Sequence, residues 1–312
     1  MGINSFYAAN ISPLLRKTEI GKRIDMAFIA FHANLQFARF MYAESGGRIF
    51  SDREIEELFA GLDEESLNIA KRFMSRQYKA LPNSLMVHPK YFYTEAEYAE
   101  YQKLRKDFNA SIRRFHLPHH QVGPESLYYH HGLRFAPEFV KTHIAGKLFG
   151  DIGGYLGDST LVFLEYNPEK ILIFEPDETF LGKLTQTLNR NHIPKEKYDI
   201  HSVGLADVDT FSNGMKCCTM DEISSNYATP FGVLKADIEG MGAAFVRGAR
   251  KTIERDRPLL SLAIYHNEEE FTEIYRMLKS WGVDYHVEIK SLNPFVAHGE
   301  VTLLAYPQEW IC

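Results

Sequence analysis

The stretch Asp151-Ile-Gly-Gly-Tyr-Leu-Gly-Asp-Ser159 decides the fold that we predict for this chain. Apolar residues lead into Asp151, a glycine-rich turn follows, and a new apolar run begins after Ser159. This order predicts a buried strand, a tight turn and a helix start, where backbone N–H groups can meet a ligand. A second apolar run, Lys170–Phe174, ends in Glu175, and an acid about 20 residues beyond such a turn suits ribose hydroxyls. The pattern therefore predicts a site for a cofactor that contains a nucleoside.

The acid at position 151 separates two classes of cofactor. The dinucleotide fingerprint Gly-x-Gly-x-x-Gly has a glycine where this chain has Asp151. A carboxylate at the strand tip would repel a pyrophosphate and attract an ammonium group. S-adenosyl-L-methionine (SAM) carries an ammonium group and no phosphate. Electrostatics therefore favour SAM over a dinucleotide.

Length and composition describe a chain with ample core. The 312 residues suit one large domain or two modest ones. A net charge of −6 gives no sign of nucleic-acid binding, and no apolar run reaches the roughly 20 residues that cross a bilayer. Cys217, Cys218 and Cys312 form neither a disulfide framework nor zinc spacing, and the first two are expected as reduced side chains in a loop. We expect a cytoplasmic protein with no nucleic-acid or membrane partner.

Residues 1–120 read as a helical N-terminal region that precedes a cofactor-binding domain at 121–312. Ser51 with Glu54, and Thr94 with Glu97, have capping-box spacing before helical apolar patterns. The region is too apolar for a disordered tail, so we expect it to pack on the following domain. A role as a cover on the substrate side is a hypothesis.

Five histidines stand near the junction of the two regions, at His116, His119, His120, His130 and His131. A metal site needs two to four converging ligands, usually with a carboxylate or thiolate nearby. Neighbouring residues point in different directions unless the backbone turns sharply. We therefore interpret these histidines as connector residues and predict no metal site.

Residues 145–306 alternate apolar runs with helical patterns, which is typical of a doubly wound, mostly parallel sheet. The strands are expected at 148–152, 170–175, 198–203, 232–236, 259–265, 284–289 and 300–306. The intervening helices are expected at 158–166, 178–191 with Asp177 as N-cap, from Gly240 to about Glu254, and after Asn267. Ligands of open α/β sheets bind outside the carboxyl ends of the strands. Five candidate site residues fall at such ends: Asp151, Glu175, Gly204, Asp237 and His266.

Each candidate also has a purely structural interpretation. Glu175 could end a strand and cap a helix, and Gly204-Leu205 could be an ordinary turn rather than the edge of an adenine site. Lys235 is unusual in an apolar strand because a buried ammonium group needs a partner. Asp237 or Glu239 could supply that partner, as a structural ion pair or as part of a catalytic arrangement. His266 could be a satisfied histidine at a strand end.

Several motifs carry a resemblance to a known family over roughly residues 123–306. They are Gly123-Pro-Glu-Ser-Leu-Tyr-Tyr-His-His-Gly-Leu133, Asp151-Ile-Gly-Gly-Tyr-Leu-Gly-Asp-Ser-Thr160, Phe174-Glu-Pro-Asp177, Leu234-Lys-Ala-Asp-Ile-Glu-Gly240, Arg257-Pro258 and Ala263-Ile-Tyr-His-Asn267. Together they resemble the FkbM-type SAM-dependent methyltransferases, and the Lys-x-Asp-x-Glu-Gly element is the most distinctive. Met241 departs from the pattern, because the family often has an acid there. The missing charge leaves the acceptor less defined.

The resemblance implies a class I, Rossmann-like methyltransferase fold with seven strands, the last of them antiparallel. It implies SAM as the methyl donor and an oxygen acceptor on a sugar or natural product. It places Glu175 on the ribose, Gly204 and Leu205 beside the adenine, and Lys235 with Asp237 and Glu239 near the methyl-transfer end. The cofactor loop is then expected from Asp151, Gly153, Gly154, Tyr155, Gly157, Asp158 and Ser159.

Methyl transfer to a hydroxyl group also requires the loss of a proton, which calls for a positioned base. Asp237, Glu239 and His266 are the candidates, in that order, with Lys235 holding the carboxylates. Two other classes remain open. An NAD-linked oxidoreductase shares the core but is disfavoured by Asp151. A non-catalytic protein with the SAM-binding fold is disfavoured by the intact acidic motifs. The sequence leaves the acceptor, pathway and oligomeric state undetermined.

Overall fold

A seven-stranded sheet forms the centre of the computed structural model, which describes residues 50–80, 94–117, 122–208, 210–212, 215–293 and 299–311. Across the sheet the order is β3 (Tyr198–His201), β2 (Lys170–Phe174), β1 (Leu148–Ile152), β7 (Phe231–Ala236), β8 (Leu259–Ala263), β10 (Val301–Pro307) and β9 (Tyr285–Ser291). The first five strands pair in parallel, and β10 runs antiparallel to both of its neighbours. This is the predicted doubly wound sheet with an antiparallel last strand.

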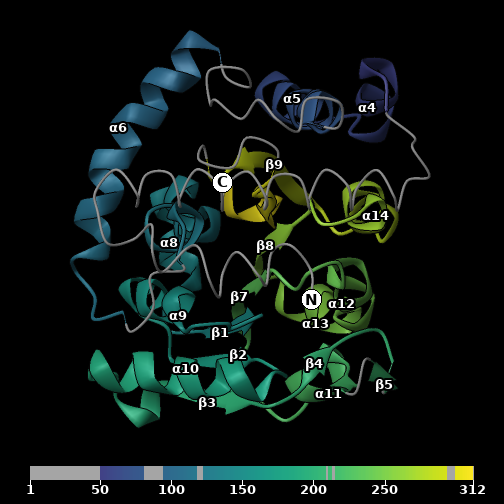
Figure 1. Ribbon diagram of the computed structural model, residues 1–312. Coiled ribbons are helices and arrows are strands. Elements are labelled where there is room, and N and C mark those ends of the chain that lie inside the picture. The colour runs from purple at the N-terminus through teal and green to yellow at the C-terminus, as the bar shows by residue number, and fades with distance from the viewer. Residues whose placement is uncertain are drawn as a thin grey trace, which may run out of the picture.

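Helices cover both faces of the sheet, with the two sets on opposite sides of the strands (Figure 1). One face carries α8 (Glu138–Ile144), α9 (Asp158–Phe163) and α10 (Glu178–Arg190). The other carries α12 (Gly242–Gly248), α13 (Arg250–Asp256) and α14 (Glu268–Ser280). The strands bury both faces because each set of helices closes its own apolar core. β1, β7 and β8 are buried at every position.

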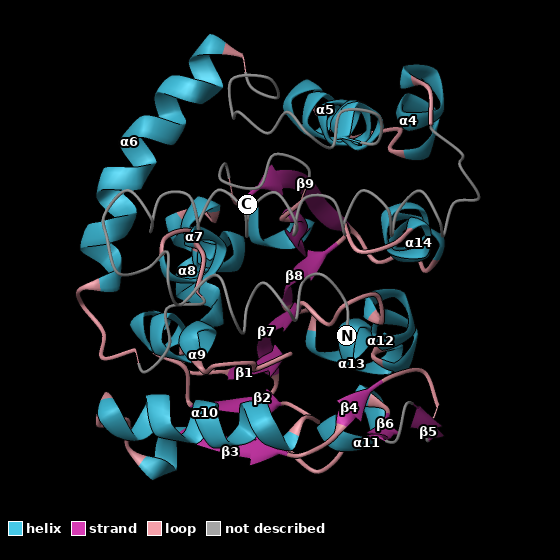
Figure 2. Ribbon diagram, viewed as in Figure 1, coloured by secondary structure: helices cyan, strands magenta, loops and turns pink. Residues whose placement is uncertain are grey.

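Shorter elements join these layers. They are α7 (Pro124–Leu127), α11 (Met220–Ser224), and the 3₁₀ turns η3 (His130–Phe135), η4 (Leu164–Tyr166), η5 (Lys195–Lys197) and η6 (Gln308–Ile311). A small second sheet, β4 (Gly204–Leu205), β6 (Met215–Cys218) and β5 (Thr210–Ser212), lies beside the main one (Figure 2). Cys217 and Cys218 lie in β6, so the prediction of a loop at these cysteines is wrong. Strands of two to four residues are too short to show a period in the sequence.

The predicted helices agree with the structure apart from one break and one change of helix type, since the end of the helix expected at 158–166 is the 3₁₀ turn η4. Asp177 accepts from the N–H groups of Thr179 and Phe180 as N-cap of α10, and Asn267 caps α14. The helix expected after Gly240 is divided at Ala249 into α12 and α13. Two short helices pack where the sequence pattern indicated one.

The N-terminal helices are α4 (Asp52–Leu58), α5 (Glu64–Ala80) and α6 (Glu95–Ile112), and both predicted capping boxes are present. α5 packs against β9, and the Ser66 hydroxyl accepts a hydrogen bond of 2.9 Å from the N–H of Ile289. Covering an edge strand in this way removes a free pairing edge. The division at residue 120 remains a prediction. No helix of the described ranges is long and apolar enough to cross a membrane.

An aromatic cluster attaches α4 and α5 to α14. Phe271 of α14 is fully buried, and its ring centroid lies 5.2 Å from that of Phe59, 5.5 Å from Phe73 and 6.1 Å from Phe50. Aromatic pairs at such separations add to the free energy gained from burial alone. Phe271 therefore links helices from distant parts of the sequence into one core.

We predict that Phe271→Ala lowers the free energy of unfolding by about 3–5 kcal/mol, because it removes a buried ring and leaves a cavity. Urea denaturation measures the change. Phe135→Ala is the matched control, since that ring is 42% exposed. Equal losses for the two variants would show that the cluster around Phe271 does not hold the N-terminal helices.

Candidate active site

Four of the predicted residues meet at one edge of the sheet. Asp151 lies in β1, and Glu175, Asp237 and His266 follow the carboxyl ends of β2, β7 and β8. These strands are parallel neighbours, so their carboxyl ends lie at the same edge. Such an edge is where ligands bind in open α/β sheets.

The glycine turn after β1 brings this strand close to the loop that follows β7. Gly153 has φ +82°, and a Cβ atom there would lie 2.1 Å from the carbonyl oxygen of Asp237. Only glycine allows this approach. Gly157, at φ +78°, is the N-cap of α9, and the side chain of Tyr155 packs on Phe180 with ring centroids 4.5 Å apart. The turn is fixed by the contact between β1 and β7 before any ligand is present.

Asp151 and Lys235 form a buried ion pair across β1 and β7. The two residues are register partners, Lys235 Nζ lies 3.1 Å from Asp151 Oδ1, and the exposures of the side chains are 0% and 2% for Asp151 and Lys235. The Thr160 hydroxyl donates to Asp151 Oδ2, and Nζ also donates to the carbonyl oxygen of Gly153 at 2.7 Å. Burial alone would lower the pKa of Lys235, but the charge of Asp151 raises it.

This pair corrects two predictions. The expected partners of Lys235 were Asp237 and Glu239, whereas register places Asp151 opposite it. Asp151 was expected to attract the ammonium group of SAM, but its carboxylate is enclosed and already neutralised by Lys235. Asp151 therefore acts within the protein, holding the two strands on which the site is built.

Glu175 has the geometry required of a ribose acceptor. Its two carboxylate oxygens each accept one backbone hydrogen bond of 2.9 Å, from the N–H groups of Tyr155 and Asp177. A carboxylate has about four lone-pair sites, so acceptor capacity remains for two hydroxyl groups. Burial raises its pKa, while the two N–H donors favour the ionised form. The residues present fit the ribose of a nucleoside cofactor.

The other predicted cofactor residues have different partners. Asp158 opens α9 and is buried, and burial raises its pKa. The Ser159 hydroxyl is 2.8 Å from Nε2 of His131 and faces the protein core. Gly204 and Leu205 form β4, with the Leu205 side chain in the core. Any contact of these two residues with an adenine ring would come from their backbone.

A buried histidine links two acids on the acceptor side. His266 Nδ1 lies 2.9 Å from Glu270 Oε2, and Nε2 lies 3.2 Å from Asp237 Oδ1 without the alignment of a hydrogen bond. Glu270 is 1% exposed and also accepts from the N–H of Gly242 at 2.8 Å. Glu239, at 87% exposure, lies 4.0 Å from Nε2. Glu270 thus fixes the imidazole, whose other nitrogen faces Asp237 and Glu239.

The charges of this cluster oppose the effect of burial. Burial alone would raise the pKa of Asp237, but the contact with His266 and the charge of Lys235 hold it well below its usual range. Burial would likewise lower the pKa of His266, but Asp237 and Glu270 raise it well above its ordinary value. These interactions favour the carboxylate form of Asp237 and the imidazolium form of His266.

Sequence reasoning missed four polar residues at the same edge. Asn293 Nδ2 donates to Glu125 Oε2 at 2.7 Å, and Tyr265 donates to Asp237 at 3.3 Å. Glu300, just before β10, is close enough to Glu125 and Asp237 for both to raise its pKa. Because β10 is antiparallel, its beginning lies where the parallel strands end. The available signals were the positions of Glu125 in the Gly123–Leu133 motif and of Tyr265 in the Ala263–Asn267 motif.

The histidines do not form a metal site in the described part of the chain. His130 Nδ1 lies 2.9 Å from the Tyr166 hydroxyl, and His131 contacts Ser159. His116 is exposed, and His119 and His120 lie outside the described residues. Within these ranges no group of three or more potential ligands is placed to hold a metal ion.

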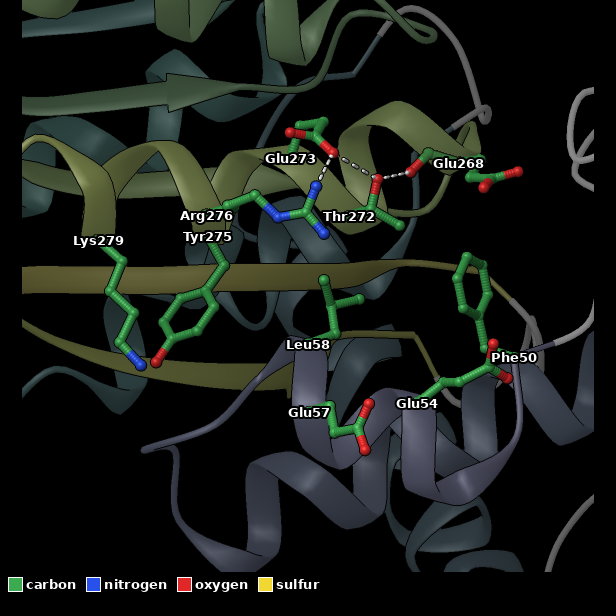
Figure 3. A pocket seen from close by; sticks show the side chains of 10 residues that line it. All are labelled: Phe50, Glu54, Glu57, Leu58, Glu268, Thr272, Glu273, Tyr275, Arg276 and Lys279. Atoms are coloured by element: carbon green, nitrogen blue, oxygen red, sulfur yellow. Dashed lines mark hydrogen bonds and ion pairs between the residues drawn. The ribbon is translucent and has the colours of Figure 1, made fainter.

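Two cavities lie away from these residues. One, of about 620 Å³, opens between α4 and α14 and is lined by side chains of both signs (Figure 3). Glu273 and Arg276 pair within it. The other, of about 700 Å³, lies near η4 and contains Arg134 and Glu165. Neither contains a residue of the carboxyl edge.

The fold is that of the class I methyltransferases. Residues 151–285, less than half of the chain, match the family described as Methyltransferase FkbM domain. The match confirms the predicted family and its methyl donor, SAM. No curated protein sequence matches the chain.

Similar solved structures include methyltransferase FkbM from Methylobacillus flagellatus KT, with a TM-score of 0.55 and 17% identity. That similarity covers 91% of this chain and 60% of the Methylobacillus chain, so the present chain spans less than two thirds of its relative. O-methyltransferase TomG from Streptomyces achromogenes, in complex with SAM, has a TM-score of 0.42 at 10% identity. That similarity covers 86% of this chain and 97% of the TomG chain. An O-methyltransferase from Bacillus cereus, in complex with S-adenosylhomocysteine (SAH), has a TM-score of 0.42 at 12% identity. That similarity covers 74% of this chain and 96% of the Bacillus chain.

We predict that Lys235→Met destabilises the fold by about 3–5 kcal/mol, because Asp151 is left as a buried, unpaired charge. The double variant Lys235→Met with Asp151→Asn should recover part of this loss. Chemical denaturation gives the values. Lys170→Met is the control, since its ion pair with Asp199 is partly exposed and should contribute less than about 1 kcal/mol. A Lys235→Met variant as stable as this control would contradict the assignment.

Proposed function

We propose that this chain is a SAM-dependent O-methyltransferase whose acceptor is a hydroxyl group on a sugar or natural-product small molecule. The observation that carries the proposal is the pairing of two sites at one sheet edge. Glu175 offers acceptor capacity for a ribose on one side of the glycine turn, and Asp237 with His266 and Glu270 stands on the other. The FkbM domain match supports the methyl donor.

When bound, SAM would supply a methyl group on a sulfonium. The acceptor oxygen would attack the methyl carbon in line, and the C–S bond would break to release S-adenosylhomocysteine. Positioning provides much of the acceleration in such a reaction. Asp237 is ionised and partly open to solvent, at 24% exposure, so it can accept the hydrogen bond of an acceptor hydroxyl. That contact orients the oxygen lone pair away from the carboxylate and toward the donor.

The proton balance follows from the chemistry of the product. Forming the new C–O bond makes the acceptor oxygen strongly acidic, so even a weak base such as Asp237 can take its proton. His266, held by Glu270, stabilises the Asp237 carboxylate through its positive charge. Asp237 can release that proton to solvent because it is 24% exposed, and the exposed Glu239 lies near it beside His266. Lys235 supports this side indirectly, through the β1–β7 contact.

A binding and a turnover measurement separate the two halves of the site. Glu175→Ala should weaken binding of S-adenosylhomocysteine (SAH) about tenfold or more, because the ribose loses charge-assisted hydrogen bonds. Asp237→Asn should keep SAH binding but lower turnover by about 10²–10⁴ once a screen of sugars and hydroxylated metabolites has found an acceptor. Calorimetry and a methyl-transfer assay provide these values.

Glu178→Ala, on an exposed helix start, is the control for both measurements. Unchanged SAH affinity in Glu175→Ala would refute the ribose role. Wild-type turnover in both Asp237→Asn and Glu239→Gln would refute the assignment of the acceptor side.

A further inference from the structure

Two loops at the carboxyl edge are tied together on the acceptor side. One follows β7 and carries Asp237, and the other follows β8 and leads into α14. Asn267, the N-cap of α14, donates from Nδ2 to the carbonyl oxygen of Gly240 at 2.8 Å. This contact fixes the separation of the loops, so side chains of the second loop reach the carboxylate of the first.

Tyr265 and His266 both reach Asp237, although they are neighbours in the sequence. Successive side chains of a strand point to opposite faces, but β8 ends at Ala263. Beyond that end the rings of Tyr265 and His266 lie with their centroids 4.0 Å apart and their planes 33° from parallel. Both side chains are buried. The phenol and the imidazole therefore approach the carboxylate as a pair.

Both contacts fall on the same oxygen of the Asp237 carboxylate. The Tyr265 hydroxyl donates to Oδ1 at 3.3 Å, and His266 Nε2 lies 3.2 Å from Oδ1. No residue in the described part of the chain donates a hydrogen bond to Oδ2. Each carboxylate oxygen has acceptor capacity of its own, so a side chain held through Oδ1 still offers Oδ2 to a ligand.

The Tyr265 hydroxyl has one proton to donate, and Glu300 also forms a hydrogen bond with it. Burial, followed by the charges of Glu125 and Asp237, raises the pKa of Glu300 well above its ordinary value. The protonated form of Glu300 donates to the phenol oxygen, which leaves the phenol proton for Asp237. Burial also raises the pKa of Tyr265, so its hydroxyl keeps that proton at neutral pH.

We propose that Tyr265 is a positioning residue for methyl transfer: its hydroxyl holds Asp237 through Oδ1, so that Oδ2 receives the acceptor hydroxyl group. This inference rests on the proposed function. As the acceptor oxygen attacks the methyl carbon and the C–S bond breaks, the proton of the acceptor passes to Oδ2. His266, held by Glu270, faces the same Oδ1. Tyr265 acts on the acceptor only through Asp237.

Tyr265→Phe tests this assignment, because it removes one oxygen atom and keeps the ring. With an acceptor found by the screen, kcat at saturating SAM and acceptor should fall about tenfold, the scale of one hydrogen bond to a charged group. Affinity for SAH, measured by calorimetry, should equal that of the wild type. Tyr275→Phe is the matched control, since that buried tyrosine donates its hydroxyl to the carbonyl oxygen of Ala60 instead.

A double-mutant cycle with Asp237→Asn distinguishes positioning from a purely structural role. If Tyr265 acts through Asp237, Tyr265→Phe should change kcat by less than about twofold in the Asp237→Asn protein, because the carboxylate that it positions is gone. A second loss of about tenfold in that background would overturn the assignment. Equal loss of SAH affinity and of kcat in Tyr265→Phe would overturn it as well.

The wild-type protein separates this inference from the function on which it rests. SAH binding and turnover in the wild type, together with an unchanged kcat in Tyr265→Phe, would refute the role of Tyr265 alone. Folded wild-type protein that neither binds SAH nor methylates any acceptor would refute the proposed function, and the role of Tyr265 with it.

Discussion

The buried ion pair between Asp151 and Lys235 is the constraint on which the site depends. It joins β1 to β7 at the carboxyl edge, where Lys235 also binds the carbonyl oxygen of Gly153. A charge buried without its partner costs several kcal/mol, so the two strands are held in one register. That register brings the glycine turn against the loop after β7. The donor and acceptor sides are therefore built from one contact.

The two sides then use acids in different ways. Glu175 keeps acceptor capacity for neutral hydroxyls after binding two backbone N–H groups. Asp237 is held as a carboxylate by His266, whose orientation is set by the buried Glu270.

The sequence predicted what depends on local pattern. Strand ends could be read from apolar runs, so the meeting of Glu175, Asp237 and His266 at one edge was foreseeable. The partner of Lys235 was not, because it depends on the register of two strands that are distant in the sequence. Glu125, Asn293 and Glu300 reach the site through tertiary packing of separate segments. Short strands such as β4 and β6 left no periodic signal.

The most direct test of the account is calorimetric titration of the wild-type protein with SAH, with NADH in parallel. Glu175 and the turn after Asp151 are expected to bind SAH, the product of SAM-dependent methyl transfer, and not NADH. A parallel melt should show about 2.7 kcal/mol of added stability at an SAH concentration 100 times the dissociation constant. Binding of SAH alone is the predicted result. Binding of NADH alone would contradict the account, and binding of neither by folded protein would favour a non-catalytic role.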